Sequence, residues 1–332
     1  MVRRLTLSTL SCLLITACAP DVDLDDAADT DSTGDEVETT GEGDETTGEG
    51  DETTGDGDEV GDGDGDGDGD GDGDGPPNFP TPTATCPSFA AGNVTMSPAG
   101  MDPRTVKVWV DPQAPSGGAL VIYWHAFTSA PEEAVFGLSQ AVIDAITSQG
   151  GMVVAPYAAS DVGTFPWFVV NGSSRQDDMM LADELVACAV EQLDVDRKRI
   201  HSMGMSAGGL QTVAFAMARS RYIASVTTYS GGASGMPPFE DPSNRFAAMI
   251  VHGGDNDTFG GTVNFKTLSI AWFNQLIGNG NFAFLCDHGG AHTLPVGMGD
   301  DVWEFFQDHP FGTEPSPYES GLPATFPSSC AL

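Results

Sequence analysis

The stretch Lys198-Arg-Ile-His-Ser-Met-Gly-Met-Ser-Ala-Gly-Gly209 contains the pattern Gly-x-Ser-x-Gly between an apolar segment and a helix-forming one. Residues 199–203 predict a strand and residues 210–219 predict a helix, so Ser206 falls on a sharp turn between them. Glycine at 204 and 208 removes the Cβ atoms that would clash where strand and helix meet. The pattern predicts a serine nucleophile above a sheet edge, with an ordinary Gly-Ser-Gly turn as the alternative.

The chain begins with the pattern of an export signal. Arg3 and Arg4 precede the apolar residues 5–15, which are too few to span a bilayer. Residues 1–17 are therefore expected to be a signal peptide that ends before Cys18. Leu14-Ile-Thr-Ala-Cys18 resembles the lipobox of bacterial lipoproteins, in which this cysteine is lipidated. We expect an exported lipoprotein anchored to a membrane at the cell envelope or surface; a plain secretory signal with an incidental Cys18 is the alternative.

Residues 18–80 have the composition of a disordered linker. Residues 21–75 contain 25 of the 49 acidic residues and no Lys or Arg. A Thr-Thr-Gly-Glu-Gly-Asp-Glu unit at 39–45 recurs at 46–52 and, with one change, at 53–59, before a Gly-Asp alternation over 61–75. Such a segment buries too little apolar surface to offset its ordering entropy. The Asp spacing fits neither an EF-hand loop nor the nonapeptide calcium repeat, so we expect a solvated tether.

Residues 81–332 are long enough for one domain with a sizeable core. After Gly75 the chain has 24 acidic and 10 basic residues, so no basic patch suggests nucleic acid as a partner. Cysteine and histidine spacings typical of a metal site are absent from the sequence. The four cysteines of this region predict two disulfides with three possible pairings, and one of these would fasten the domain's ends together through Cys86 and Cys330. The candidates are Cys86, Cys188, Cys286 and Cys330.

Strand and helix patterns alternate along this region, which predicts a mostly parallel, doubly wound α/β sheet. Ligands of such sheets bind at the carboxyl ends of the strands, where Ser206 is expected. The predicted strands cover residues 105–110, 119–124, 152–157, 199–203, 223–229, 247–252 and 282–286. The predicted helices cover residues 134–148, 177–193, 210–219, 265–276 and 301–307.

A serine nucleophile needs a base, and the base needs a group that orients it. When these residues occur in the chain order Ser, acid, His, the base follows the last strand. His288 and His292 both lie in the glycine-rich loop after residues 282–286. We favour His292, with His288 as the alternative.

The acid is expected after the strand that ends at His252. Asp255 and Asp257 both follow this strand, and either carboxylate would accept a hydrogen bond from an imidazole N–H. We favour Asp257, with Asp255 as the alternative; the remaining one would cap the next helix.

The oxyanion donors are expected to be the backbone N–H groups of Ala207 and Phe127. Ala207 begins the helix after Ser206, and Phe127 follows the strand 119–124. His125 is expected to hold this loop by hydrogen bonds. The aromatic residues Trp124, Phe165 and Trp167 are expected to line a pocket that receives a phenolic, sugar or polyester group; packing of loop side chains onto the domain is the alternative.

From about residue 97 to 312 the chain resembles the α/β-hydrolase family of secreted polyhydroxybutyrate depolymerases and feruloyl or acetylxylan esterases. The residues that carry the resemblance are Asp177-Asp178, Val195-Asp196, Arg199-Ile200, Gly204-Met-Ser-Ala-Gly-Gly209, His252-Gly253, Gly290-Ala-His-Thr293 and Trp303-x-Phe305-Phe306. It implies ester hydrolysis through an acyl-enzyme by Ser206, Asp257 and His292, without a cofactor. The chain departs from the family at His125-Ala126 and in the extra residue that places Asp257 five positions after His252.

The expected function is that of an exported serine esterase acting on a polyester oligomer or a plant-polysaccharide ester. A serine peptidase on the same fold and a catalytically inactive, surface-anchored binding protein are the alternatives.

Overall fold

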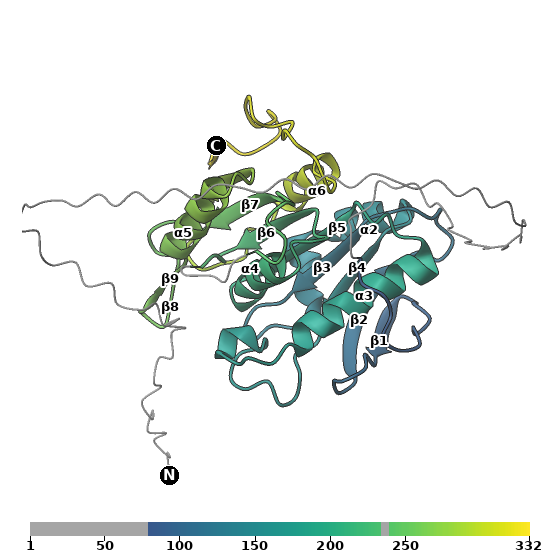
Figure 1. The fold of residues 1–332 in the computed structure, drawn as a ribbon. Helices are drawn as coiled ribbons and strands as arrows, with labels where there is room; N and C mark the ends of the chain where they lie inside the picture. The colour runs from purple at the N-terminus through teal and green to yellow at the C-terminus, as the bar shows by residue number, and fades with distance from the viewer. Residues whose placement is uncertain (1–78, 234–238) are drawn as a thin grey trace, which may run out of the picture. The chain divides into compact units, whose positions relative to one another are not determined.

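The computed structural model describes residues 79–233 and 239–332 (Figure 1). The expected signal peptide, Cys18 and all of the expected linker up to residue 78 lie outside the described residues. Phe79, the first described residue, packs against Tyr222, with ring centroids 5.6 Å apart. Within the described residues, no helix has both the length and the apolar character needed to cross a membrane.

A nine-stranded sheet forms the centre of the described chain (Figure 1). Its strand order is β1-β2-β4-β3-β5-β6-β7-β10-β11. Neighbouring strands from β4 to β10 run parallel, whereas β1, β2 and β11 pair antiparallel at the two edges, so the predicted fold class is confirmed. The strands are β1 (Gly92–Met96), β2 (Arg104–Val110), β3 (Leu120–Trp124), β4 (Met152–Pro156), β5 (Ile200–Met205), β6 (Ser225–Tyr229), β7 (Ala247–His252), β10 (Ala283–Asp287) and β11 (Cys330–Ala331).

Helices cover both faces of the sheet (Figure 1). One face carries α3 (Asp177–Leu193), α4 (Ala207–Ala218) and α5 (Phe265–Gly278), and the other carries α1 (Ala134–Gly137), α2 (Gln140–Ser148) and α6 (Gly299–Asp308). A separate hairpin, β8 (Thr258–Phe259) with β9 (Val263–Asn264), lies between β7 and α5 in the chain.

The two faces of the strands pack into two separate cores. In β3, Leu120, Ile122 and Trp124 join the core beneath α3, α4 and α5, while Val121 and Tyr123 join the opposite one. Because both faces are covered, every residue of β3 is buried, which explains its uninterrupted apolar sequence. Removal of this surface from water stabilises the fold by roughly 25 cal/mol per Å² of apolar area.

The single helix predicted over residues 134–148 is wrong, because the structure has two helices there. α1 ends at Gly137, and α2 begins after Ser139, which has a φ of +76°. The Ser139 hydroxyl accepts a hydrogen bond from the N–H of Val142 at 3.2 Å and so caps α2. The apolar periodicity continues across this break and conceals it.

β1, β11 and the β8–β9 hairpin have no counterpart among the predicted strands. β8, β9 and β11 are two residues long, so none of them shows an alternating pattern. β1 has the sequence Gly-Asn-Val-Thr-Met, with only two large apolar residues. These strands form through pairing with their neighbours rather than through a strong pattern of their own.

The described cysteines form two disulfides, Cys86–Cys188 and Cys286–Cys330. The suggestion that Cys86 and Cys330 fasten the two ends of the domain together is therefore wrong. Each end is instead fastened to a nearby element. Cys330 lies opposite Cys286 in the β10–β11 register, and Cys86 forms its disulfide with Cys188 of α3.

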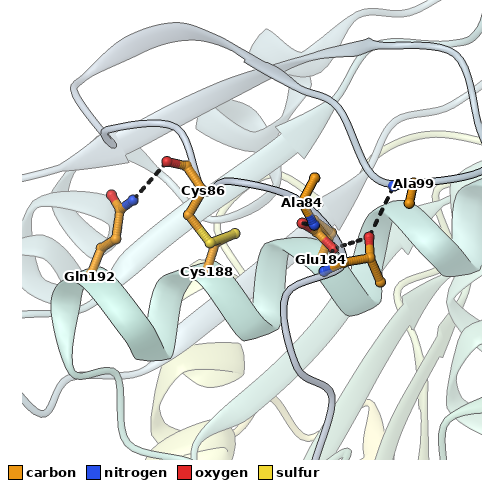
Figure 2. Close-up of a disulfide and its surroundings, with 7 residues drawn as sticks. Ala84, Cys86, Ala99, Glu184, Cys188 and Gln192 are labelled. Carbon is orange, nitrogen blue, oxygen red and sulfur yellow. Dashed lines mark hydrogen bonds between the residues drawn. A yellow bond between two sulfur atoms is a disulfide. The ribbon is translucent and has the colours of Figure 1, made fainter.

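The segment before β1 is also held on α3 by the buried carboxylate of Glu184 (Figure 2). One oxygen of Glu184 accepts hydrogen bonds from the N–H and the hydroxyl of Thr83, at 2.8 and 2.7 Å. The other oxygen accepts from the N–H of Ala84 at 3.1 Å. The amide of Gln192 donates to the carbonyl of Cys86 at 3.1 Å. Side chains from successive turns of α3 thus attach this segment beside the disulfide.

Candidate active site

Ser206 lies on the turn that joins β5 to α4, at the carboxyl edge of the parallel strands. Its backbone has φ +56° and ψ −115°, a conformation that non-glycine residues rarely adopt. The N–H of Ser206 donates to the carbonyl of Tyr229 at 2.8 Å, and its own carbonyl accepts from the N–H of Leu210 at 2.9 Å. These bonds hold the strained turn in place.

The glycines around Ser206 are required by close backbone contacts. A Cβ on Gly208 would lie 1.7 Å from the carbonyl oxygen of Trp124 at the end of β3. A Cβ on Gly204 would lie 2.5 Å from that oxygen and from the carbonyl oxygen of Gly208. Neither position accommodates a side chain, and α4 therefore starts directly against the end of β3.

A continuous line of contacts joins Ser206, His292 and Asp257. The Ser206 Oγ lies 2.9 Å from His292 Nε2, and His292 Nδ1 lies 2.7 Å from Asp257 Oδ1. With a proton on Nδ1, the imidazole donates to Asp257 and accepts from the serine hydroxyl. Ser206 is 7% exposed, so this side chain is close to the surface but largely enclosed.

Asp257 is fully buried, and every contact it makes favours its ionised form. Its Oδ2 accepts hydrogen bonds from the Ser230 hydroxyl and from the N–H of Gly253, each at 2.8 Å. Burial by itself raises the pKa of Asp257, but the hydrogen bonds from His292, Gly253 and Ser230 outweigh it and hold the pKa below its ordinary value. The carboxylate is therefore ionised at neutral pH, ready to stabilise an imidazolium.

The alternative acid and base lie elsewhere. Asp255 is an exposed side chain, and its Oδ1 accepts a hydrogen bond from Lys266 Nζ at 2.6 Å. His288 folds back on its own loop, where its Nδ1 accepts from the N–H of Gly290 at 3.3 Å. Between these alternatives, the structure brings Asp257 and His292 together with Ser206.

Three other histidines make contacts with other residues. His201 stacks on Phe306 inside the core, with ring centroids 4.6 Å apart, and its Nδ1 lies 2.9 Å from the Ser225 hydroxyl. His309 contacts the carbonyl of Phe305 through Nδ1 at 2.9 Å. His252 ends β7, where its Nδ1 accepts from the N–H of Gly254 at 3.1 Å.

His125 and Glu133 hold the loop after β3 in place. His125 Nδ1 donates to the carbonyl of Ala126 at 2.9 Å, and burial lowers the pKa of His125, so the ring stays neutral. Glu133 Oε1 accepts from the N–H of Ala126 at 3.0 Å and from the Tyr123 hydroxyl at 3.1 Å. Burial raises the pKa of Glu133. The next N–H along the chain is that of Phe127.

The backbone N–H groups of Ala207 and Phe127, the expected oxyanion donors, have no acceptor among the described residues. The loop and the helix that carry them meet closely, because a Cβ on Gly208 would also lie 2.9 Å from the carbonyl of His125. Ala207 in addition opens α4, and a helix N-terminus favours negative charge.

Two of the three residues expected to line a pocket are core residues instead. Trp124 and Trp167 are fully buried and pack edge to face, with ring centroids 4.9 Å apart. Their indole N–H groups donate to the Ser202 hydroxyl and to the carbonyl of His125, each at 3.0 Å. The prediction is therefore wrong for both. Alternation along β3 directs the Trp124 side chain into the core beneath α3, α4 and α5, and Trp167 packs against it in the same core. Phe165 is half-buried near the site.

Sequence reasoning missed two phenylalanines beside the candidate base. Phe265, the first residue of α5, stacks on the His292 ring, with centroids 4.5 Å apart and planes 13° from parallel. Phe259 from β8 lies 6.2 Å from that ring and is 37% exposed. Ser230, the third partner of Asp257, was also missed. The only sequence signals were proximity to Asp257 for the phenylalanines and a position just after a strand for Ser230.

A polar hollow of about 460 Å³ lies near the ends of β2 and β4. Arg104, Tyr157, Asp161, Arg175 and Asp177 are among its lining residues, and none of the three residues joined at Ser206 belongs to it. Its arginines are already paired with carboxylates, Arg175 with Asp161 and Asp177, and Arg104 with Asp178. Within the described residues, no group of His, Cys, Asp and Glu side chains is arranged to hold a metal ion.

The sheet order, the helices on both faces and the serine turn after β5 define the α/β-hydrolase fold. Solved structures of other proteins have a similar fold. The native form of a protein named sOPH matches 76% of this chain and 96% of its own, with a TM-score of 0.59 and 18% sequence identity. The native form of pOPH matches 74% of this chain and 96% of its own, with a TM-score of 0.59 and 16% identity.

A thermostable esterase also shares the fold. It matches 66% of this chain and 62% of its own, with a TM-score of 0.51 and 13% identity. No protein-family model matches this sequence, and no curated protein matches it significantly. At these identities the likeness establishes the fold, and activity has to be argued from the site.

Proposed function

We propose that this protein is a serine esterase that hydrolyses carboxylic esters through an acyl-enzyme, with Ser206 as nucleophile, His292 as base and Asp257 as the orienting acid. The line of contacts from the Ser206 Oγ through His292 to buried Asp257 carries this proposal. Serine is a weak nucleophile unless an adjacent base removes its proton, and this arrangement supplies such a base. The shared fold of the thermostable esterase supports it.

The proposed reaction starts with attack of the Ser206 Oγ on the ester carbonyl carbon, while His292 Nε2 accepts the serine proton. The imidazolium that forms is stabilised by ionised Asp257. It then donates its proton to the leaving alcohol oxygen as the carbon–oxygen bond breaks, which leaves an acyl group on Ser206. Water, deprotonated by His292, attacks this acyl group and releases the carboxylic acid.

The N–H groups of Ala207 and Phe127 are proposed to bind the oxyanion of each tetrahedral intermediate. Removal of one such donor in other enzymes costs about 2.7–4 kcal/mol of transition-state stabilisation. Glu133 is suited to position the Phe127 donor, because its bond to the N–H of Ala126 fixes the preceding peptide. Alanine at 126 leaves this arrangement intact, so the departure from the family's His-Gly does not exclude it.

The test uses the chain from Pro76 onward and its Ser206→Ala variant. Both are assayed on p-nitrophenyl acetate, butyrate and octanoate, methyl ferulate, acetylated xylan, hydroxybutyrate oligomers and unactivated peptides. We expect cleavage of esters by the wild type only, together with labelling of Ser206 by a fluorophosphonate. The preferred ester then distinguishes a polyester oligomer from a plant-polysaccharide ester. Ester cleavage that survives Ser206→Ala would refute the proposal.

We further propose that the protein is exported and that Cys18 carries a lipid anchor, with residues 18–80 as a tether to the catalytic domain. The lipobox-like sequence before Cys18 supports the anchor, and the two disulfides support an oxidising compartment. Expression of the full chain in bacteria, followed by membrane fractionation, should place the wild type in the membrane and Cys18→Ala in the soluble fraction. Deletion of residues 21–75 should leave kinetics on soluble esters unchanged.

A further inference from the structure

Three phenylalanines from separate loops meet beside the candidate active site. Phe127 follows β3, Phe165 lies between β4 and α3, and Phe259 belongs to β8. Their ring centroids are 5.1 Å apart for Phe127–Phe165, 6.1 Å for Phe127–Phe259 and 6.3 Å for Phe165–Phe259. All three pairs meet edge to face, the geometry that aromatic quadrupoles favour. They are called the phenylalanine cluster below.

The phenylalanine cluster lies at the edge of one core. Of its three members, Phe127 packs against that core, whereas Phe165 and Phe259 belong to neither core. Phe259 sits on a hairpin of two-residue strands whose turn, Gly260-Gly261, adopts positive φ, and it is 37% exposed. Core packing therefore does not account for a third ring at this position. Apolar surface held open to water beside a reactive group is typical of a binding surface.

The position of the cluster assigns it to one side of the ester. Phe127 supplies a proposed oxyanion donor, and Phe259 lies 6.2 Å from the His292 ring. The leaving alcohol oxygen must reach His292, since this residue returns the proton to it. Phe265 covers one face of the imidazole, and Phe259 is a partly exposed aromatic ring near it, so we place the group bound to that oxygen beside Phe259.

We propose that Phe127, Phe165 and Phe259 bind the alcohol group of the ester and select apolar alkyl and aryl alcohols. This inference rests on the proposed ester hydrolysis. The cluster offers edges and faces of three rings and no charged side chain. An aryl or medium-length alkyl alcohol gains both area burial and ring contacts there, whereas a short or charged alcohol gains neither.

The test separates the two sides of the ester. One series keeps the acyl group and varies the alcohol through ethyl, butyl, hexyl and benzyl acetate. The other keeps the alcohol and varies the acyl group through ethyl acetate, butyrate and hexanoate. The variants are Phe259→Ala, Phe259→Leu and Phe165→Ala. Phe136→Ala is the control, because Phe136 is 61% exposed on α1 and lies outside the cluster.

In the wild type, kcat/KM should rise from ethyl to hexyl and benzyl acetate. Phe259→Ala should lower the benzyl-to-ethyl and hexyl-to-ethyl ratios about tenfold, mainly through KM, which corresponds to about 1.4 kcal/mol. Phe259→Leu should retain the hexyl preference and lose most of the benzyl preference. Phe136→Ala should behave as the wild type. Labelling by a fluorophosphonate and an unchanged melting temperature establish that each variant is folded.

Two results would overturn the inference while leaving the proposed function intact. One is that Phe259→Ala changes the acyl series instead of the alcohol series; the other is that it lowers kcat/KM equally for all acetates. A failure of the proposed function is a different outcome, in which no ester is hydrolysed in a Ser206-dependent way, and that result would overturn both.

Discussion

Gly253 and Ala291 join the loop of the candidate acid to the loop of the candidate base through their backbones. The N–H of Ala291 donates to the carbonyl of Gly253 at 2.9 Å, and a Cβ on Gly253 would lie 1.8 Å from the carbonyl oxygen of Ala291. The N–H of Gly253 also donates to Asp257. Gly253 thus holds the Asp257 carboxylate and, through its bond to Ala291, positions the adjacent His292.

Gly253→Ala should separate the two loops and lower kcat by two orders of magnitude or more, because misplacement by about 1 Å costs on the order of 100-fold. Esterase kinetics and thermal unfolding measure the effect. Gly278→Ala is the matched control, since a Cβ there meets no atom within 4 Å. A Gly253→Ala enzyme with wild-type kcat would show that the Gly253–Ala291 contact does not determine the position of Asp257 and His292.

Asp257→Asn should lower kcat by roughly 10³–10⁴-fold, because an amide favours the wrong imidazole tautomer and does not stabilise the imidazolium. Asp255→Asn should leave kcat within about twofold, since this exposed carboxylate contacts Lys266 and not His292. Both variants replace a carboxylate by an amide, at positions only two residues apart. Equal losses in both would invalidate the assignment of the acid.

Arg104→Met should destabilise the fold by roughly 3–5 kcal/mol, because it leaves the carboxylate of Asp178 buried without a charged partner. The Arg104 Nη1 to Asp178 Oδ1 distance is 3.1 Å, and the two side chains are 5% and 3% exposed. Asp178 also accepts from the N–H of Phe168 at 2.8 Å, so this pair holds the loop that carries Phe165. Urea unfolding measures the loss of stability.

Arg245→Met provides the comparison for this buried pair. Arg245 and Glu314 are about half exposed and 3.7 Å apart, and such surface pairs contribute under about 1 kcal/mol. A similar loss of stability in both variants would mean that burial of the Arg104–Asp178 pair is unimportant.

Loss of the Cys86–Cys188 disulfide should lower the unfolding free energy by roughly 2–5 kcal/mol. The bond closes a loop with a sequence separation of 102, so it restricts the unfolded chain strongly. A Cys86→Ala, Cys188→Ala double variant is compared with the wild type by denaturant unfolding without reductant. Unchanged stability, or two free thiols in the unreduced chain from Pro76 onward, would contradict the pairing.

Acidification should destabilise the fold between pH 6.5 and about 3 through His201. Burial, followed by the nearby Arg199 charge, lowers the pKa of His201 to about 3, below its ordinary 6.5. In this range the unfolded chain binds a proton that the folded chain does not, so stability falls as the pH falls, by roughly 3 kcal/mol at pH 4. His201→Gln should show a shallower decline in unfolding free energy from pH 6.5 to 4. A decline as steep as that of the wild type would exclude this residue as the cause.

Much of the fold was predictable because its strands are covered on both faces. Apolar runs such as residues 247–251 mark parallel strands, and β7 has the predicted bounds, 247–252. Helix α3 also has its predicted bounds, 177–193. The break at Ser139 was not predicted because the apolar periodicity continues across it, and the edge strands were not predicted because they form through pairing with their neighbours.

The sequence also placed Ser206, Asp257 and His292 at ends of strands, where topology brings them together. It failed for Trp124, because alternation gives the face of a strand residue only when the register is known. It failed for Trp167, because this residue lies in the loop between β4 and α3, which has no periodic pattern. The aromatic residues around the candidate base could not be predicted from the sequence. Phe259 is positioned by a hairpin of two-residue strands, and Phe265 is positioned by the start of α5.

The attachment of the N-terminal segment to α3 has a mechanical consequence. A pulling force applied at Phe79 enters the domain through the covalent bond at Cys86 and continues into the middle of a long helix packed on the sheet (Figure 2). The disulfide bypasses the chain between Cys86 and β1, so the edge strand is protected from being peeled from β2. An enzyme held at this end and dragged by flow would transmit the load to α3 rather than to its edge strand.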